Sequence, residues 1–146
     1  MVLIERANPT DRADVERLIA AYHASESMKP RPERITWAVE QVLRNRVGGV
    51  LLVAREKRAV VGVALAVYSP SAEHGRLLLV NDFFVDPAMR RKGVGRALAT
   101  RLLDEAKAMR VERIDLEVTP GTPLGRTPSR IADSGPAASC APGPVP

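Results

Sequence analysis

A short stretch near the middle of the chain combines clustered cations with two glycines. The stretch contains the cationic residues Arg90, Arg91, Lys92 and Arg96 and the glycines Gly93 and Gly95. A helix is predicted to begin here, and cations at a helix N-terminus oppose the positive end of its dipole unless an anion lies among them. The free N–H groups of the helix start could cradle a phosphate, because glycines let the backbone approach closely. A solvated basic helix start is the alternative, and the preceding strand and long amphipathic helix favour the anion site.

Two common phosphate-binding motifs do not fit these residues. A P-loop requires Gly-Lys followed by Ser or Thr, which the sequence lacks. A dinucleotide-binding fingerprint requires a third small residue where Leu98 stands. It also requires a tighter strand-to-helix turn than residues 86–92 provide. A phosphate bound at this turn would therefore be held by neither of these two motifs.

The same stretch resembles the pyrophosphate-binding motif of the GNAT superfamily of N-acetyltransferases. Arg90-x-x-Gly93-x-Gly95 is similar to that family's Gln/Arg-x-x-Gly-x-Gly/Ala pattern. Residues 81–87 resemble the family's fourth strand, and residues 116–119 resemble its fifth. The resemblance covers residues 1–119. It implies a fold that binds acetyl-CoA as co-substrate and transfers the acetyl group to a primary amine of a small molecule or peptide, without a metal.

The resemblance also implies which residues bind the coenzyme. In the family, backbone N–H groups of the motif bind the pyrophosphate, and backbone groups of the fourth strand pair with the pantetheine arm. These strand groups could also polarise the thioester carbonyl. By match, the coenzyme-binding residues are Phe83, Phe84, Val85, Arg90, Arg91, Lys92, Gly93, Val94, Gly95 and Arg96.

Asp82 is the candidate catalytic base. The acceptor amine must lose a proton before it attacks, so a base within reach is useful. A carboxylate in an otherwise apolar strand is costly unless it is paired or functional. The alternative is that Asp82 faces solvent or binds a basic neighbour. Glu117 is a weaker candidate on the same reasoning, and Asn81 is expected to point to the opposite face of the sheet from Asp82.

The acceptor amine lies, in the family, at the loop between the first two helices, here residues 24–34. Glu26 and Glu33 in this loop hint at a cationic acceptor. Trp37 lies off the apolar stripe of its helix, so it could touch a substrate or a partner subunit, or pack half-exposed on a neighbouring strand. His23 and His74 are isolated in the sequence, show no metal-ligand spacing and receive no role.

Alternating helical and strand periods in residues 1–119 must position these residues. Strands are predicted over residues 2–6, 50–54, 60–68, 77–85 and 113–118. Helices are predicted from a Thr10 cap to Tyr22, from Pro32 to the glycines at 48–49, and from Val94 to Met109. The order β-α-α-β-β-β-α-β predicts an α+β domain with a GNAT-like mixed sheet that lacks the family's usual last helix and two strands.

The composition changes sharply at Pro120. Residues 120–146 hold seven of the twelve prolines and four of the ten glycines, so we expect a disordered tail after the domain of residues 1–119. In the family a helix follows here whose tyrosine often protonates the leaving thiolate, but no tyrosine follows Tyr68. The general acid is therefore unassigned. A frameshift near the Gly121/Thr122 junction, a natural truncation and a partner chain that completes the fold all remain open.

Charge and composition narrow the function classes further. The net charge is +5, yet aromatic residues make up 3%, which argues against a base-stacking nucleic-acid binder. Cys140 is the sole cysteine, and no apolar run approaches the ~18 residues of a membrane span. We expect a cytoplasmic N-acyltransferase, its activity open to impairment by the unusual C-terminus, and leave a homodimer open. A non-catalytic coenzyme A binding or assembly module is the alternative, and a basic nucleic-acid binder the third.

Overall fold

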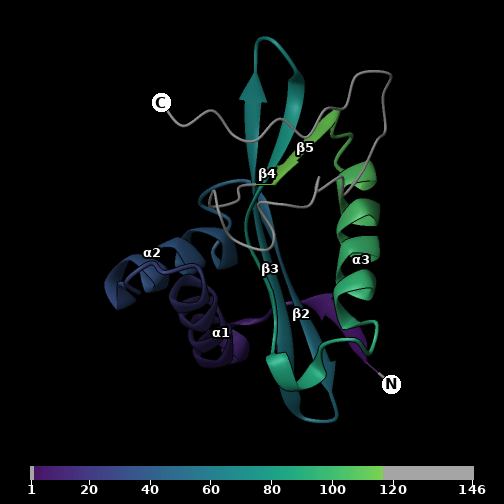
Figure 1. The fold of residues 1–146 in the computed structure, drawn as a ribbon. Helices are drawn as coiled ribbons and strands as arrows, with labels where there is room; N and C mark the ends of the chain where they lie inside the picture. The colour runs from purple at the N-terminus through teal and green to yellow at the C-terminus, as the bar shows by residue number, and fades with distance from the viewer. Residues whose placement is uncertain (1, 117–146) are drawn as a thin grey trace.

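Five apolar runs form a single mixed sheet in the computed structural model, which describes residues 2–116 (Figure 1). The strands are β1 (Leu3–Arg6), β2 (Gly49–Glu56), β3 (Ala59–Ser71), β4 (Gly75–Val85) and β5 (Arg113–Leu116). They lie in the order β1-β2-β3-β4-β5, with antiparallel neighbours except for the parallel pair β4 and β5. A parallel pair needs a crossover connection, and a helix provides it here. The predicted α+β fold with a mixed sheet is confirmed.

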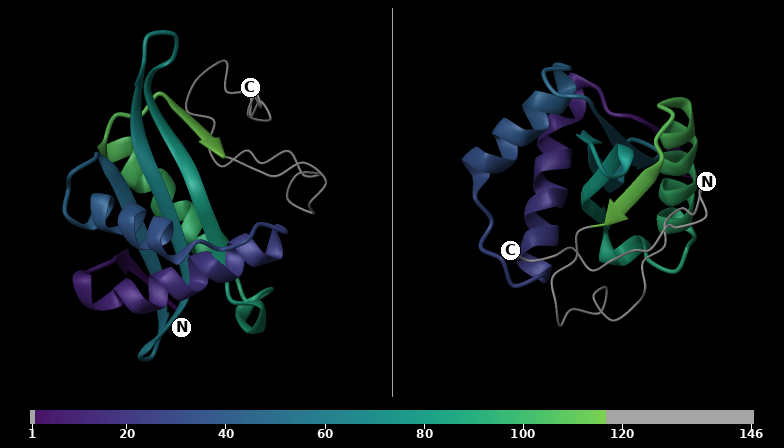
Figure 2. Two further views of the ribbon diagram at one scale, coloured as in Figure 1. Left: turned by 90° about the vertical axis from the view of Figure 1, so that its left-hand side faces the viewer. Right: turned by 90° about the horizontal axis from the view of Figure 1, so that it is seen from above.

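Three helices cover both faces of this sheet (Figure 2). Helices α1 (Arg12–Ser25) and α2 (Pro32–Leu43) lie on one face, and the crossover helix α3 (Val94–Ala108) lies on the other. Short 3-10 turns precede α1 and α3, at Pro9–Asp11 and Pro87–Met89. The molecule thus has three layers, and the sheet separates the α1 and α2 side from the α3 side.

Each face of the sheet has its own hydrophobic core, because successive strand residues point to opposite faces. On the α3 side, Leu52 and Ala64 pack with Leu98 and Leu102. On the other side, the core includes Leu18, Val39, Val53, Val63 and Phe84. Strand residues two apart therefore share a core along β2 and β3.

A β-bulge in β4 breaks this alternation at Asn81. Leu65 pairs with Asp82 while Ala66 pairs with Val80, so Asn81 is the extra residue of β4. Before the bulge Val80 packs in the α3-side core, and after it Phe84 packs in the core under α1 and α2. The bulge thus turns the even-numbered residues of β4 from one face to the other. Asp82 comes directly after the bulge. It pairs with Leu65, whose side chain belongs to the core under α1 and α2.

Three local predictions were wrong in detail. Asn8, rather than Thr10, caps the first turn, in a capping box with Asp11. Helix α2 ends at Leu43 rather than at the glycines, since Asn45 has a φ of 54°. Gly49 begins β2, and a Cβ there would lie 2.6 Å from a carbonyl oxygen.

The predicted strand stop at Ser69 and Pro70 was also wrong, because β3 continues to Ser71. Pro70 pairs with Arg76 and is one residue before Ser71, the last residue of β3. A proline is tolerated near the end of a strand, where few ladder hydrogen bonds depend on its missing N–H. The predicted tail at 120–146 lies outside the described residues.

Candidate active site

The turn between β4 and α3 has the backbone expected of an anion site. Gly93 is the N-cap of α3 with a φ of 82°, and Arg91 has a φ of 65°. A Cβ on Gly93 would meet nothing within 4 Å, so the left-handed conformation, rather than crowding, favours glycine here. The cap has no side-chain hydrogen bond and the first turn of α3 has no acidic residue. The first N–H groups of α3 therefore remain available to a ligand.

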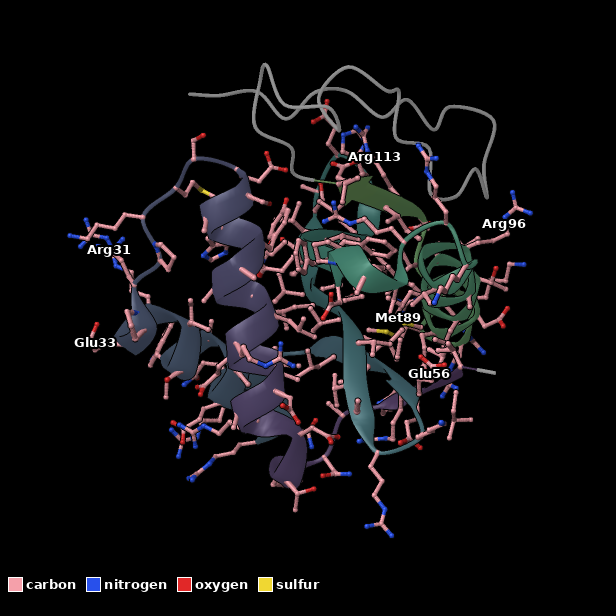
Figure 3. All side chains as sticks on the ribbon, turned by 60° about the horizontal axis from the view of Figure 1, so that its bottom comes forward. Arg31, Glu33, Glu56, Met89, Arg96 and Arg113 are labelled. Carbon is pink, nitrogen blue, oxygen red and sulfur yellow. The ribbon has the colours of Figure 1, made fainter. Side chains whose placement is uncertain are left out.

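The four cations of this turn divide into two kinds. Arg90 is held in place: its Nε donates to the Val85 carbonyl oxygen at 3.2 Å, and its guanidinium lies 5.2 Å from the centre of the Phe84 ring. Arg91, Lys92 and Arg96 are exposed and pair with no carboxylate within residues 2–116. Figure 3 shows Arg96 projecting outward from α3. One cation thus fixes the turn to the end of β4, and three can meet an anion.

Asp82 and His23 form a polar pair between β4 and α1. His23 Nε2 lies 2.7 Å from Asp82 Oδ1, and the two side chains are 24% and 10% exposed. The bulge at Asn81 brings Asp82 to this face of the sheet, and the last turn of α1 supplies His23. A carboxylate that accepts a hydrogen bond from an imidazole orients the ring and stabilises its protonated form. The pair can therefore accept a proton.

No role was predicted for His23, although the sequence contains a signal for it. His23 lies four residues after Ile19, an apolar residue that is buried on α1. Residues four apart share a helix face, so His23 had to approach the sheet. The sequence did not indicate that the bulge would place the Asp82 carboxylate opposite His23.

A cavity of about 690 Å³ opens beside the Asp82–His23 pair, between α1, α2 and the sheet. The described residues that line it are Ile19, His23, Met28, Lys29, Arg31, Arg34, Ile35, Trp37, Ala38, Leu65 and Asp82. Trp37, 64% exposed, lies at this cavity as one of the predicted substrate residues. Glu33 is exposed on the first turn of α2 and does not line the cavity (Figure 3). The volume is in the range of small-molecule sites.

A second cavity of about 380 Å³ lies where the end of α1 meets the end of β4. It is lined by Tyr22, Ser25, Glu26, Phe83, Phe84, Val85 and Arg90. Three of these are the β4 residues predicted to meet the coenzyme arm. Glu26 is 6% exposed, and its Oε2 has no hydrogen-bond partner within the described part of the chain. Glu26 and Trp37, both predicted for the acceptor, therefore line different cavities.

Two sequence predictions lie outside the described residues. They are Glu117 and the segment expected to supply the general acid. Among residues 2–116, no group of His, Cys, Asp and Glu side chains is arranged to hold a metal ion. No helix in that range is long and apolar enough to cross a membrane.

Comparison with known proteins identifies the class of protein that this fold and site define. Residues 13–123 match the acetyltransferase (GNAT) family, and the chain belongs to that family. Enzymes of the family transfer acetyl groups, so the resemblance noted in the turn sequence is confirmed at the level of the whole domain. A comparison with curated protein sequences finds no match.

Solved structures with the same fold support the assignment. A predicted acetyltransferase from Clostridium acetobutylicum, crystallised with acetyl-CoA, is 21% identical with a TM-score of 0.72, over 86% of this chain and 84% of that one. The ribosomal-protein-alanine N-acetyltransferase of Brucella melitensis biovar Abortus 2308 is 26% identical with a TM-score of 0.69, over 86% and 87%. An aminoglycoside acetyltransferase from an uncultured soil metagenomic sample is 21% identical with a TM-score of 0.64, over 81% and 78%.

Proposed function

We propose that this protein is an acetyl-CoA-dependent N-acetyltransferase that acts on a primary amine. The observation that carries the proposal is the start of α3, where N–H groups without a side-chain cap lie beside three cations that have no carboxylate partner among residues 2–116. A pyrophosphate satisfies both features at once, because it accepts hydrogen bonds from the N–H groups and neutralises the cations. Membership of the GNAT family supports acetyl-CoA as the ligand that carries it.

The pantetheine arm has a place along the end of β4. Phe83, Phe84 and Val85 line the smaller cavity together with Arg90, which connects them to the turn. Backbone N–H and C=O groups of such a strand can pair with the amides of the arm. An N–H aimed at the thioester carbonyl would stabilise the charge that develops on its oxygen.

The Asp82–His23 pair supplies the base in this proposal. The acceptor ammonium gives a proton to the pair, and the free amine nitrogen attacks the thioester carbonyl carbon. A C–N bond forms, the C–S bond breaks, and the nitrogen's second proton passes to the departing sulfur, which leaves an amide and the free coenzyme thiol. His23 is the more exposed member, so we assign it the contact with the amine and assign Asp82 the orientation of the ring.

The test is calorimetric titration with acetyl-CoA of the wild type and two Gly95 variants. A Cβ at Gly95 would lie 3.8 Å from Val85 and 4.0 Å from Phe83, which is ordinary contact. Gly95→Ala should therefore bind. Gly95→Asp should reduce affinity about a hundredfold or more, because it places a carboxylate where the phosphates lie. An acid in the first turn favours the helix, so the loss would not reflect unfolding.

Thr100→Asp is the matched control, since it places the same charge on an exposed position of α3 away from the turn. Gly93→Asp is a poorer choice, because the φ of 82° strains any side chain. Binding of acetyl-CoA equally by Gly95→Asp and Thr100→Asp would contradict the proposed site. Tight binding without transfer to any amine would favour the non-catalytic coenzyme module instead.

A further inference from the structure

The rim of the larger cavity has an unusual charge for a site that receives an amine. Three cations line it, Lys29, Arg31 and Arg34, and Asp82 is the only acid among the described residues that do so. Asp82 is already engaged by His23 at 2.7 Å. The acidic loop residues that hinted at a cationic acceptor lie elsewhere, because Glu26 lines the smaller cavity and Glu33 lines neither.

None of these three cations has a carboxylate partner among residues 2–116. Away from the cavity, Arg12, Arg17 and Arg44 of the α1 and α2 region each lie within 3.6 Å of a carboxylate oxygen. Arg31 and Arg34 also flank the start of α2, where the helix dipole repels cations. Three positive charges therefore converge on one cavity without a paired carboxylate among the described residues.

The rest of the cavity wall is apolar. Ile19, Met28, Ile35, Trp37, Ala38 and Leu65 contribute it. A ligand that fills this space gains from burying an apolar body against these side chains. The cavity volume of about 690 Å³ suits a small molecule rather than a folded partner.

We propose that the acceptor is a small amine that also carries an anionic group, such as the carboxylate of an amino acid, beside an apolar body. The amine meets the Asp82–His23 pair, the apolar body packs against the cavity wall and Trp37, and the anionic group meets the cations of the rim. Arginine binds carboxylates with two parallel hydrogen bonds, which would orient the acceptor as well as attract it. This inference rests on the proposed acetyltransferase function and names its substrate class.

The test compares acceptors that differ only in charge. Phenylalanine and leucine carry the carboxylate, and their amides keep the size and shape without it. The amine of an amide loses its proton more readily, so a preference for the carboxylate cannot arise from amine reactivity. We expect kcat/KM for acetyl transfer to be about tenfold or more higher for the carboxylates, the worth of a charge-assisted hydrogen bond.

Arg34→Gln should raise KM for the carboxylate acceptors about tenfold and leave KM for the amides and for acetyl-CoA unchanged. Arg46→Gln is the matched control, since Arg46 is exposed, follows α2 and does not line the cavity. Neither side chain is buried, so neither variant threatens folding. An equal effect of Arg34→Gln on carboxylates and amides would overturn the proposal, as would amides that react as well as the carboxylates.

Binding is measured separately from transfer. Trp37 is the single tryptophan of the chain and lines the cavity, so its fluorescence reports acceptor binding without turnover, in the presence or absence of coenzyme A. A fluorescence response to the carboxylates that Arg34→Gln weakens, without acetyl transfer, would support this inference while the acetyltransferase proposal failed. Acetyl transfer to amines that lack an anionic group, with no fluorescence response to any carboxylate, would contradict this inference and support the acetyltransferase proposal.

Discussion

At the scale of single residues, the proposed function depends most on the contact between Asp82 and His23. Neither side chain is fully exposed, and each lies on the wall of the larger cavity. The carboxylate in the apolar strand is therefore paired, which was one of the two alternatives weighed from the sequence. Pairing does not remove it from the chemistry, because the carboxylate holds the His23 imidazole in one orientation at the cavity wall.

We predict that His23→Asn lowers kcat for acetyl transfer about a hundredfold, the worth of a general base. The Kd for acetyl-CoA should not change, because the coenzyme contacts lie on other residues. His74→Asn is the matched control, since His74 lies by the β3–β4 hairpin and contacts Arg113 instead. Steady-state kinetics with titrated coenzyme would check both variants. Equal kcat values for the two histidine variants would remove His23 from the mechanism.

Asp82→Asn tests the orienting role of the carboxylate. The amide keeps the shape and can still hydrogen-bond His23, but it cannot stabilise a protonated ring. We expect kcat to fall by about tenfold to a hundredfold with KM for the acceptor little changed. A rise in KM alone would instead make Asp82 a residue that binds the acceptor.

At the scale of elements, an ionic network joins β1 to α3. Glu105 of α3 accepts hydrogen bonds from Arg6 Nη2 at 2.5 Å and from Arg101 Nη2 at 3.1 Å, and Arg101 also donates to the Ile4 carbonyl oxygen. The hydrogen bond from Arg6, aided by that from Arg101, lowers the pKa of the Glu105 carboxyl below its ordinary value of 4.5. The network thus connects the edge strand β1 to α3, the helix whose start is proposed to bind the coenzyme.

This shift makes the stability of the fold depend on pH. The unfolded chain binds a proton at Glu105 near pH 4.5 while the folded chain does so at a lower pH, so the unfolded state holds more protons in that range. The contribution of Glu105 is complete well above pH 4.5 and declines as the pH falls through the lowered pKa. Acid should therefore loosen the contact between β1 and α3.

We predict that Glu105→Gln lowers the free energy of unfolding by about 1–2 kcal/mol at pH 7, because it leaves two arginines without their carboxylate. The difference from the wild type should shrink below pH 4.5. Urea unfolding at several pH values would measure it, with Asp104→Asn, an exposed neighbour on α3, as the control. A pH-independent difference would mean that the charge of Glu105 contributes nothing.

At the scale of the whole molecule, the start of α3 and the larger cavity lie on opposite sides of the sheet and are joined by β4. Arg96 projects from α3 on one side of Figure 3, and Arg31 lies at the start of α2 on the other. The bulge at Asn81 lets β4 contribute to both sides of the sheet. Phe83 and Val85 pack toward the α3-side core, while Asp82 lines the larger cavity. In this proposal the sheet lies between the coenzyme phosphates and the acceptor, and the reacting groups meet near β4.

Separation of the sites predicts additivity. Arg96→Gln should raise the Kd for coenzyme A about threefold to tenfold, and Arg34→Gln should raise KM for the acceptor. In the double variant, the change in Kd and the change in KM should each stay within about 0.5 kcal/mol of the value in the single variant, because the residues share no partner. Calorimetry and steady-state kinetics on the four proteins would complete the cycle. A coupling above about 1 kcal/mol would show that the two sites are not independent.

The amino-acid sequence alone determined the local features of this protein. The glycines and cations at 90–96 marked the turn proposed to bind the coenzyme, and the apolar periods located the five strands and three α-helices of residues 2–116. Such features depend on neighbours a few residues apart, so a pattern in the sequence contains them. The sequence located the ends of the elements less accurately. Strand β2 begins at Gly49, where a Cβ would collide with the Ala66 carbonyl oxygen of β3.

The tertiary structure alone decided how distant residues meet. His23 and Asp82 are 59 positions apart, and their contact depends on a bulge that arises only when β4 pairs with β3. The same holds for the acceptor loop, where Glu26 turned into the smaller cavity and the cations lined the larger one. Side-chain direction across two elements is set by register and packing, which couple residues far apart in the chain and leave no local pattern.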